Sequence, residues 1–554
     1  MKQENVKYYE VKKVNSIKEL MNNAVCEAGD KVAFKYKKDK EVVDVTYSEF
    51  QNLTNYLGTA LCSISSVNKH IGVIGENSFK WLSVYITVLK SSGVFVPIDK
   101  ELPKEDIIYI LNHSDCEVLF FSKRYEKYIE DIIKNTNVKY FIGFNSNNTE
   151  KIINYDEFLE KGKQMYLDGC NEYVNITPDT DKLKMIVYTS GTTGMAKGVM
   201  LSEHNLVSCV YYGLQVSAVY DRCLSVLPYH HTYESTGILF ALHHHSTICI
   251  NDNLKSILKN LVLYKPDYIC LVPAFAEMFY KKILDNAKKT HKEITLKMLI
   301  RVSNILRKFH IDLRKTFFKS IHDVFGGNMR KIVVGGAPLR PELGEFFESI
   351  GISLVNGYGI TECSPMVSAN IDYLNDPSTV GYELPCLEVK FENMTEDKEG
   401  EICVKGDTVM LGYYKNESQT KKVLKNGWFN TEDYGKRNEK GQIIITGRKK
   451  NLIVLDNGKN VFPEEIENYI MGIDYIQEVI VCGIENENHE QTGLVAKVYL
   501  NKEKAESLDN YPTEDSIRKD ILKVTQSLPV YKKIQKVEIM EEAFKKTTTN
   551  KIKR

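Results

Sequence analysis

The chain has 554 residues, which is too many for one hydrophobic core, so at least two domains are expected. Lysine plus arginine and aspartate plus glutamate both number 73, and this zero net charge argues against a nucleic-acid-binding protein. No apolar run approaches the length of a membrane span, and the first residues have no secretory signal. The 12 cysteines form no C-x-x-C pair, which favours reduced thiols, a cytoplasmic protein and no zinc site.

Residues 1 to about 180 have the pattern of alternating strands and helices. Residues 67–76 and 94–98 are apolar runs that predict strands, and residues 78–92 and 107–112 predict helices. Strands that alternate with helices imply a parallel sheet with both faces covered. We interpret these residues as scaffold.

Residues 187–199 have the composition of a phosphate-binding loop. Apolar residues enter and leave the stretch, and Lys197 is its one charged residue. Glycines let the backbone approach an anion, and small hydroxyls add donors. A Walker loop is excluded because Lys197 does not follow a glycine and precedes Gly198. A flexible surface turn is disfavoured by the flanking strands, so the predicted phosphate ligands are Thr189, Ser190, Gly191, Thr192, Thr193, Gly194 and Lys197.

The same loop resembles that of the adenylate-forming superfamily, which includes acyl-CoA synthetases, peptide-synthetase adenylation domains and luciferases. The usual pattern there is Ser/Thr-Ser/Gly-Gly-Ser/Thr-Thr-Gly-x-Pro-Lys-Gly. Ala196 stands where proline is common, which affects the stiffness of the loop more than its chemistry.

Residues 227–234 are similar to an L-P-x-x-H-x-F/Y-E motif of long-chain acyl-CoA synthetases, and His231 and Glu234 match it. The resemblance implies that the His231 imidazole orients the substrate carboxylate as part of the catalytic set. The alternative is a packed histidine with a satisfied hydrogen bond. Three further histidines, 243–245, could suggest a metal site, but consecutive side chains point in different directions.

Residues 281–331 are basic, and a helical insertion is expected at about 285–328, as in long-chain acyl-CoA synthetases. Apolar residues recur there at steps of three and four, which predicts a helical stripe made of Leu299, Val302, Leu306, Phe309, Leu313, Phe317, Ile321 and Val324. One interpretation is a helix pair packed on the core with a solvated basic face. The other is peripheral contact with an anionic membrane surface through Arg307, Arg314 and Lys315, at the inner face of the membrane.

Residues 332–337 and 354–362 are expected as strands of a parallel sheet that deliver their loops to the ligand-binding edge. The second contains Y-G-x-T-E, a signature of the superfamily, in which a tyrosine beside glycines can stack on adenine. Glu362 is a hard oxygen ligand suited to Mg²⁺. By resemblance, Thr189 lies with Glu362 at that ion, Asn356 meets the adenine amino group, and the nucleotide site includes Gly336, Ala337, Pro338, Asn356, Gly357, Tyr358, Gly359 and Thr361.

Residues 381–447 contain short strands and turns, which predict a small β-subdomain. Residues 428–433 resemble the superfamily's W-F/L-x-T-G-D, with Glu432 in place of the usual glycine. The resemblance implies that Asp433 accepts hydrogen bonds from both ribose hydroxyls, that Arg448 contacts ribose or the α-phosphate, and that Lys450 is the hinge.

The last hundred residues predict a small α/β domain. One helix is expected to start at 463–467 and another to span 513–528, with strands at 479–484 and 494–500. Residues 547–554 resemble the T-x-T-x-K-I/V-K/R-R ending of long-chain acyl-CoA synthetases. Lys551 is therefore expected to be the catalytic lysine, although a lysine in a basic tail is by default solvated.

The resemblance extends from about residue 30 to the last residue and implies an α/β fold. The large N-terminal domain, residues 1–449, would contain two α/β subdomains and a small β-barrel-like subdomain. Residues 450–554 would form a small mobile α+β domain. The implied reaction is ATP- and Mg²⁺-dependent activation of a carboxylic acid, expected to be a medium- or long-chain fatty acid, to an acyl-adenylate. Pyrophosphate is released, and coenzyme A then takes the acyl group as a thioester.

Three alternatives are open. A fatty acyl-AMP ligase would transfer the acyl group to an acyl carrier protein. An amino-acid activator usually has an aspartate early in its pocket, which we do not find in residues 229–237. A nucleotide-binding regulator without turnover is disfavoured because each expected catalytic position is filled. Acyl chain length is not readable, because the pocket is built from distant segments. The tryptophan gate of one long-chain subgroup is missing, since the only tryptophans are Trp81 and Trp428.

Overall fold

The computed structural model describes residues 6–64, 67–189, 196–395, 398–456, 459–485, 491–546 and 552. The chain forms two compact units. Unit 1 consists of Met1–Ala337, Glu342–Glu388 and Val404–Phe429, and unit 2 of Pro338–Pro341, Val389–Cys403 and Asn430–Arg554. The expected α/β fold, with a large N-terminal and a smaller C-terminal part, is confirmed. The boundary between residues 449 and 450 stays a prediction.

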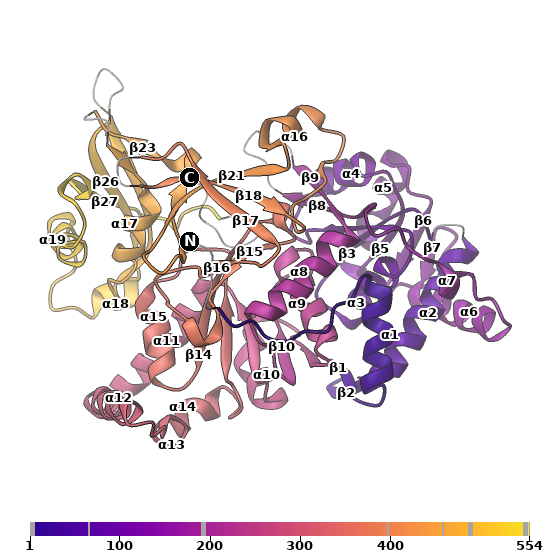
Figure 1. Ribbon diagram of the computed structural model, residues 1–554, viewed down its shortest axis with the longest axis horizontal. Helices are drawn as coiled ribbons and strands as arrows, with labels where there is room; N and C mark the ends of the chain where they lie inside the picture. Colours follow the sequence, from indigo (N-terminus) through magenta and orange to yellow (C-terminus); the bar gives the residue numbers. More distant parts are fainter. Residues whose placement is uncertain are drawn as a thin grey trace. The chain divides into compact units, whose positions relative to one another are not determined.

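An eight-stranded sheet in unit 1 has the order β19-β9-β8-β4-β3-β5-β6-β7 (Figure 1). The strands are β3 (His70–Ile74), β4 (Val94–Ile98), β5 (Cys116–Phe121), β6 (Tyr140–Gly143), β7 (Ile152–Asn154), β8 (Leu183–Thr189), β9 (Lys197–Ser202) and β19 (Gly412–Tyr413). Pairing is parallel from β8 to β7 and antiparallel between β8, β9 and β19. The parallel sheet expected for the first 180 residues is therefore confirmed.

A nine-stranded sheet, also in unit 1, has the order β16-β15-β14-β13-β12-β10-β11-β1-β2. Its strands are β1 (Val32–Lys38), β2 (Glu41–Thr46), β10 (Arg222–Ser225), β11 (Thr247–Ile250), β12 (Tyr268–Leu271), β13 (Lys331–Val334), β14 (Ser353–Gly359), β15 (Met366–Ala369) and β16 (Tyr382–Glu383). β13 and β14 pair in parallel, as predicted, so the loops after them leave the same edge of the sheet.

Helix α3 (Phe79–Leu89) joins the two sheets because it is apolar all round and buried on every side except at Lys80. It begins at Ser78, whose hydroxyl accepts a hydrogen bond from the Trp81 N–H over 3.2 Å. It contacts β3 and β4, and the Tyr85 hydroxyl donates to the Ser235 carbonyl of α9 (Thr232–His243) over 3.3 Å.

Other helices surround these sheets. They are α1 (Ile17–Ala28), α2 (Tyr47–Ser63), α4 (Lys104–His113), α5 (Ile129–Asn135), α6 (Tyr155–Leu167), α7 (Glu172–Asn175), α8 (Glu203–Val216), α10 (Ile257–Tyr264), α15 (Pro341–Ser349) and α16 (Glu417–Val423). Of these, α1, α2, α6, α8 and α16 begin at a residue whose side chain accepts a hydrogen bond from the first turn. In Figure 1, α8 and α9 lie side by side, and α2 packs on α6.

The basic insertion is helical, as predicted. The prediction that its apolar residues form a single stripe is wrong. The segment contains four helices, α11 (Pro273–Lys289), α12 (Glu293–Lys308), α13 (Arg314–Phe317) and α14 (Lys319–Val324). The chain turns after α12, where His310 has a φ of 61°, so the predicted stripe is not on one face. Val302, Phe309, Leu313 and Val324 are exposed rather than packed on the core.

Unit 2 has its own hydrophobic core between α17 (Pro463–Ile470), α19 (Glu514–Val524) and a three-stranded sheet. That sheet consists of β25 (Ile476–Glu485), β26 (Gln491–Leu500) and β27 (Lys536–Ile539), beside α18 (Lys502–Glu506) and the pair β23 (Ile453–Val454) and β24 (Asn460–Val461). The predicted helix after Pro463, the two long strands and the Thr513 cap are confirmed.

The predicted short strands of residues 381–447 form a five-stranded sheet in the order β17-β18-β21-β20, with β22 paired to β21. They are β17 (Leu387–Glu392), β18 (Gly400–Gly406), β20 (Leu424–Lys425), β21 (Trp428–Arg437) and β22 (Ile443–Arg448). Over the whole described chain, no helix combines the length and the apolar character that crossing a membrane requires.

Candidate active site

The predicted phosphate loop connects two neighbouring antiparallel strands. β8 ends at Thr189, β9 begins at Lys197, and these two residues are partners in the strand register. The strands are buried through Met185–Val187 and at Val199 and Leu201, so the loop has a rigid stem. The predicted phosphate ligands Ser190, Gly191, Thr192, Thr193 and Gly194 lie outside the described residues.

Tyr413 connects this stem to Glu362. It lies on β19, which pairs with β9 and places Tyr413 opposite Val199. The Lys197 ammonium lies over the Tyr413 ring, 5.4 Å from its centroid, and the Tyr413 hydroxyl donates to Glu362 Oε1 over 2.9 Å. Two residues predicted from separate motifs, Lys197 and Glu362, are thus held by one aromatic side chain.

The Glu362 carboxylate is suited to a cation. The residue is only 8% exposed, and its backbone carbonyl accepts a hydrogen bond from the Met410 N–H over 2.8 Å. The hydrogen bond from the Tyr413 hydroxyl compensates part of the cost of burying this polar side chain. A hard oxygen ligand close to a phosphate loop fits Mg²⁺, and Thr189, at the end of β8, can add its hydroxyl.

The predicted adenine-binding residues follow β13 and end β14. Asn356 is buried, its amide donates to the Thr379 carbonyl over 3.2 Å, and its Oδ1 has no partner among the described residues. A Cβ on Gly359 would come within 2.0 Å of the Pro365 carbonyl oxygen, so only glycine fits there. An unpaired buried acceptor beside a tight glycine turn suits an amino group of a flat base.

The other residues predicted to bind the nucleotide follow β13 or lie at the end of β14. Most of them belong to unit 1, and one belongs to unit 2. Gly336 has a φ of 81° and open space where a Cβ would be, which suits the approach of a ligand. Ala337 follows in unit 1, whereas Pro338 belongs to unit 2. The other members, at the end of β14 and just beyond it, are Gly357, Tyr358 and Thr361.

His231 begins α9 as its capping residue. Its Nδ1 accepts a hydrogen bond from the Tyr233 N–H over 3.2 Å, so in the neutral ring the proton is on Nε2. Tyr233 in turn donates to the Val333 carbonyl over 3.1 Å, which fixes the start of α9 against β13. His231 therefore caps α9 through Nδ1, and its role toward a substrate stays a prediction.

Glu234, the other match to that motif, anchors α9. Its Oε1 accepts from the Ser225 hydroxyl over 2.5 Å and from the Val226 N–H over 3.1 Å, at the end of β10. Burial raises the pKa of Glu234 to about 7. Both neutral and charged forms are therefore accessible near neutral pH, in contrast to an exposed glutamate.

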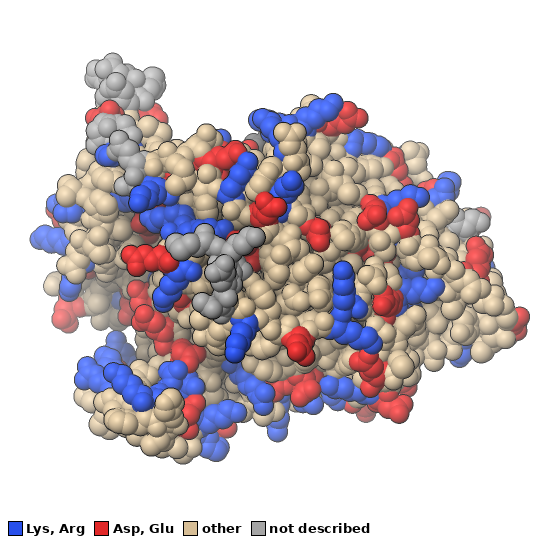
Figure 2. Space-filling model, viewed as in Figure 1, with Lys and Arg blue, Asp and Glu red and all other residues tan. Residues whose placement is uncertain are grey.

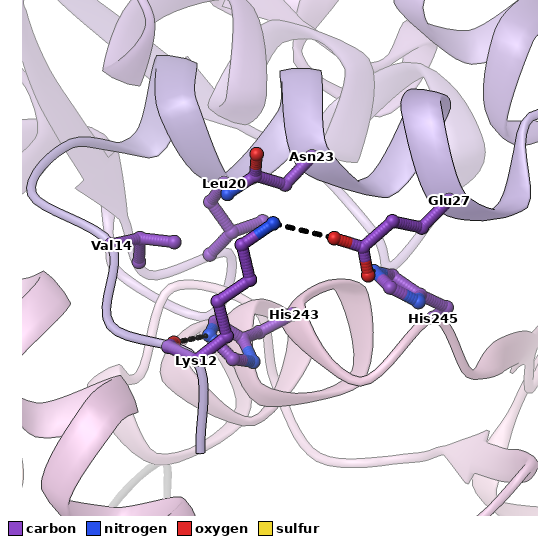
Figure 3. A pocket seen from close by; sticks show the side chains of 7 residues that line it. All are labelled: Lys12, Val14, Leu20, Asn23, Glu27, His243 and His245. Atoms are coloured by element: carbon purple, nitrogen blue, oxygen red, sulfur yellow. Dashed lines mark hydrogen bonds and ion pairs between the residues drawn. The ribbon is translucent and has the colours of Figure 1, made fainter.

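The three histidines at the end of α9 and just beyond it, residues 243–245, have different surroundings. Figure 3 shows His243 and His245 beside Lys12 and Glu27 at the wall of a small pocket. His243 Nε2 donates to the Lys12 carbonyl over 2.8 Å, and His245 Nε2 lies 3.8 Å from Glu27. Burial lowers the pKa of both imidazoles. Among the described residues no cluster of three or more His, Cys, Asp or Glu could hold a metal.

In unit 2, Asp433 and Arg448 face each other across β21 and β22. Arg448 Nε lies 3.0 Å from Asp433 Oδ1, and the aspartate side chain is 4% exposed. The Thr431 hydroxyl accepts from the Asp433 N–H over 3.1 Å and donates to the Ile402 carbonyl over 2.9 Å. These contacts fix the side chain of Asp433, the residue predicted to bind the ribose, on the sheet.

The predicted hinge and the predicted catalytic lysine are also in unit 2. Lys450 is exposed in a short turn, and its neighbour Lys449 pairs with the buried Glu401 over 3.0 Å. Lys551 lies outside the described residues. Among the described residues near it in sequence, Ile552 forms a β-bridge with Lys546.

Glu478 on β25 fixes this tail. Its Oε1 lies 2.6 Å from the Lys546 ammonium, and its Oε2 accepts from the Phe544 N–H over 2.8 Å. The carboxylate is buried, which strengthens both contacts. Sequence reasoning missed Glu478 and Tyr413. The Gly-Tyr pair at 412–413 is only a weak sequence signal for Tyr413. Nothing in the sequence of its strand distinguishes Glu478.

Comparisons with known proteins identify the family. A profile described as AMP-binding enzyme matches residues 22–414, and one described as AMP-binding enzyme C-terminal domain matches residues 450–554. A fatty acyl-CoA synthetase B of Dictyostelium discoideum is 30% identical over 475 residues, covering 79% of this chain and 70% of that protein. A chloroplastic long-chain-fatty-acid–acyl-carrier-protein ligase of Arabidopsis thaliana is 28% identical over 572 residues, covering 88% and 77%.

Solved structures show the same fold. The adenylation domain of a carboxylate reductase from Mycobacterium chelonae has a TM-score of 0.79 at 19% identity, covering 97% of this chain and 88% of that chain. An anthranilate CoA ligase in complex with anthranoyl-AMP has a TM-score of 0.76 at 18% identity, covering 100% and 97%.

Proposed function

The chain belongs to the AMP-binding enzyme family, and from that premise we propose that it activates a carboxylic acid with ATP and transfers the acyl group to coenzyme A. The observation that carries this proposal is the contact chain from Lys197 through Tyr413 to Glu362 at the stem of the glycine-threonine loop. Relatives named as fatty acyl-CoA synthetases and long-chain-fatty-acid–CoA ligases support a fatty acid as the substrate.

The first task of such a site is to bring two anions together. The loop between Thr189 and Lys197 binds the β- and γ-phosphates, and Lys197 neutralises part of their charge. Mg²⁺ held by Glu362 and Thr189 would supply further positive charge to the leaving pyrophosphate. The Tyr413 hydrogen bond keeps the Glu362 carboxylate oriented before the nucleotide arrives.

The adenine and the acid are oriented by neutral groups. Asn356 Oδ1 accepts from the adenine amino group, and the Tyr358 ring stacks on the base. His231 donates from Nε2 to the substrate carboxylate, because its Nδ1 is engaged with the backbone of α9. Such a hydrogen bond holds the carboxylate in line for attack on the α-phosphate.

Unit 2 supplies the remaining groups. Asp433 accepts from the ribose hydroxyls, and Arg448 contacts the ribose or the α-phosphate. Lys551 stabilises the charge that develops between the attacking carboxylate and the α-phosphate. The acyl-adenylate is hydrolysable, so thioester formation follows after a change of domain orientation at Lys450.

A panel of acids from acetate to palmitate, scored by pyrophosphate release with and without coenzyme A, tests the function. We expect the highest kcat/KM for medium- or long-chain acids, and a thioester visible by mass when coenzyme A is present. Pyrophosphate exchange that no carboxylic acid stimulates would contradict the proposal.

A second candidate is a ligase that delivers the acyl group to an acyl carrier protein. The acyl-carrier-protein ligase of Arabidopsis thaliana, which matches 88% of this chain, supports it. Equal concentrations of coenzyme A and a phosphopantetheinylated carrier protein, offered together, distinguish the two acceptors by mass.

A further inference from the structure

Helix α12 has apolar side chains on two opposite faces. Leu296 and Ser303 on one face are buried, Leu299 and Leu306 near them are partly buried, and the helix contacts α11. The opposite face is solvent-exposed, with exposed fractions of 83% for Ile294, 56% for Ile305 and 70% for Phe309. The full exposed set is Ile294, Met298, Val302, Ile305 and Phe309.

These five side chains form one continuous stripe. At 3.6 residues per turn they fall within an arc of about 80°, on the side opposite Leu296 and Ser303. Single exposed apolar residues are ordinary, but a contiguous row along a helix marks an interaction surface. We call this row the outer stripe of α12.

Basic residues border the outer stripe. Between residues 281 and 319 the sequence has twelve Lys or Arg residues and three Asp or Glu residues, in a chain of zero net charge. Arg301 and Lys308 are exposed at one edge of the stripe and form no ion pair within the described part of the chain. Figure 2 shows Lys and Arg side chains along the margin of an uncharged surface over these helices.

The arginines at 307 and 314, which the sequence suggested for lipid contact, have a different role. Arg307 and Arg314 both pair with Glu348 over 2.8 Å, so they fix the insertion to α15. A substitution at these positions would damage packing, and it would not test a surface.

We propose that the outer stripe of α12 docks on an anionic lipid bilayer, with the apolar side chains in the headgroup boundary and Arg301 and Lys308 on lipid phosphates. An apolar row edged by Lys and Arg is the pattern of a helix that lies in the membrane interface. A second copy of the chain fits less well, because symmetric pairing of this face would bring its basic residues together.

Vesicle co-sedimentation of the full chain tests this proposal. The probes are vesicles of phosphatidylglycerol mixed with phosphatidylcholine, and vesicles of phosphatidylcholine alone. We expect binding to the anionic vesicles that weakens with added salt. The triple variant I294Q/I305Q/F309Q should bind at least about tenfold more weakly, and R301Q/K308Q should lose the preference for anionic vesicles.

Two controls keep the outcome interpretable. V262Q/L263Q removes two exposed apolar residues of α10 and should bind like the wild type. F309W keeps the apolar surface, so its extra fluorescence should shift to the blue on anionic vesicles even if the triple variant is unstable. The lipid assignment would be overturned if the triple variant bound vesicles as well as the wild type, or if F309W showed no blue shift. It would also be overturned if the wild type self-associated and the triple variant did not.

Discussion

The Tyr413 hydroxyl donates a 2.9 Å hydrogen bond to Glu362 Oε1, and the same ring lies beneath the Lys197 ammonium. Tyr413 is thus the contact between the stem of the phosphate loop and the carboxylate proposed to hold Mg²⁺. Its two contacts are separable, because phenylalanine retains the ring and loses only the hydroxyl.

We expect Tyr413→Phe to raise the Mg²⁺ concentration needed for half-maximal pyrophosphate exchange and to lower kcat roughly tenfold, since a hydrogen bond to a charged group contributes about 1.5 kcal/mol or more. Titration of Mg²⁺ in the exchange assay measures it. Tyr414→Phe is the matched control, because that hydroxyl bonds the exposed Asp115 over 2.7 Å. If Tyr413→Phe needed the same Mg²⁺ concentration as the wild type, Tyr413 would not position the Glu362 carboxylate.

The two half-reactions should respond to different lysines. Lys551→Ala should lower adenylate formation by roughly a hundredfold or more, if the lysine stabilises the transition state by about 3 kcal/mol, and spare thioester formation from supplied acyl-adenylate. Lys450→Pro should do the reverse by stiffening the hinge. Single-turnover assays of each half-reaction measure both effects, and equal losses in both variants would contradict the division of roles.

Residues whose chemistry requires contiguous neighbours were predictable from sequence. The strands that flank the glycine-threonine loop and the strand before Glu362 are present as predicted, and Asp433 and Arg448 lie on paired strands. Tyr413 was not predictable, because Glu362 is 51 residues away in the sequence and the position of Tyr413 depends on the pairing of β19 with β9. In α12 the periodicity was visible, but a helix with two apolar faces does not reveal which face is buried.

Glu478 should act as a positioning residue for the C-terminal tail. Glu478→Gln weakens the contact with Lys546 and keeps the size of the side chain, so the segment before Lys551 should be held less firmly. We expect adenylate formation to fall several-fold more than thioester formation from supplied acyl-adenylate, because only the first step needs Lys551. Glu538→Gln, which breaks the exposed pair with Lys536, is the control. A parallel loss of both half-reactions would indicate a general folding defect instead.

A buried lysine in unit 1 should make stability depend on pH. Burial lowers the pKa of Lys90 from 10.5 to about 7, although its ammonium donates to Gln51, Thr54 and Asn55 over 2.9–3.0 Å. Between these two pKa values the folded state binds fewer protons than the unfolded state, so the free energy of unfolding rises with pH. This gain in stability from Lys90 is lost as the pH falls toward 7.

Relative to Lys90→Met, the wild type should therefore gain about 1.4 kcal/mol per pH unit between roughly pH 7.5 and 9.5. Denaturant unfolding at several pH values measures this difference. Lys134→Met, at an exposed position, should show no such trend. A constant difference between Lys90→Met and wild type across this range would mean that Lys90 does not change protonation on folding.

Glu432 occupies a position where glycine would be more stable. Its φ of 59° is in the left-handed region, which costs a residue with a Cβ about 1 kcal/mol, and its N–H is already bonded to Asn430 Oδ1 over 2.9 Å. Glu432→Gly keeps that backbone bond and removes the strain, so the melting temperature should rise by about one to a few degrees. Glu439→Gly changes another exposed glutamate on the same hairpin, at a position without a positive φ, and should lower the melting temperature. Equal shifts in the two variants would show that the backbone at Glu432 is not strained.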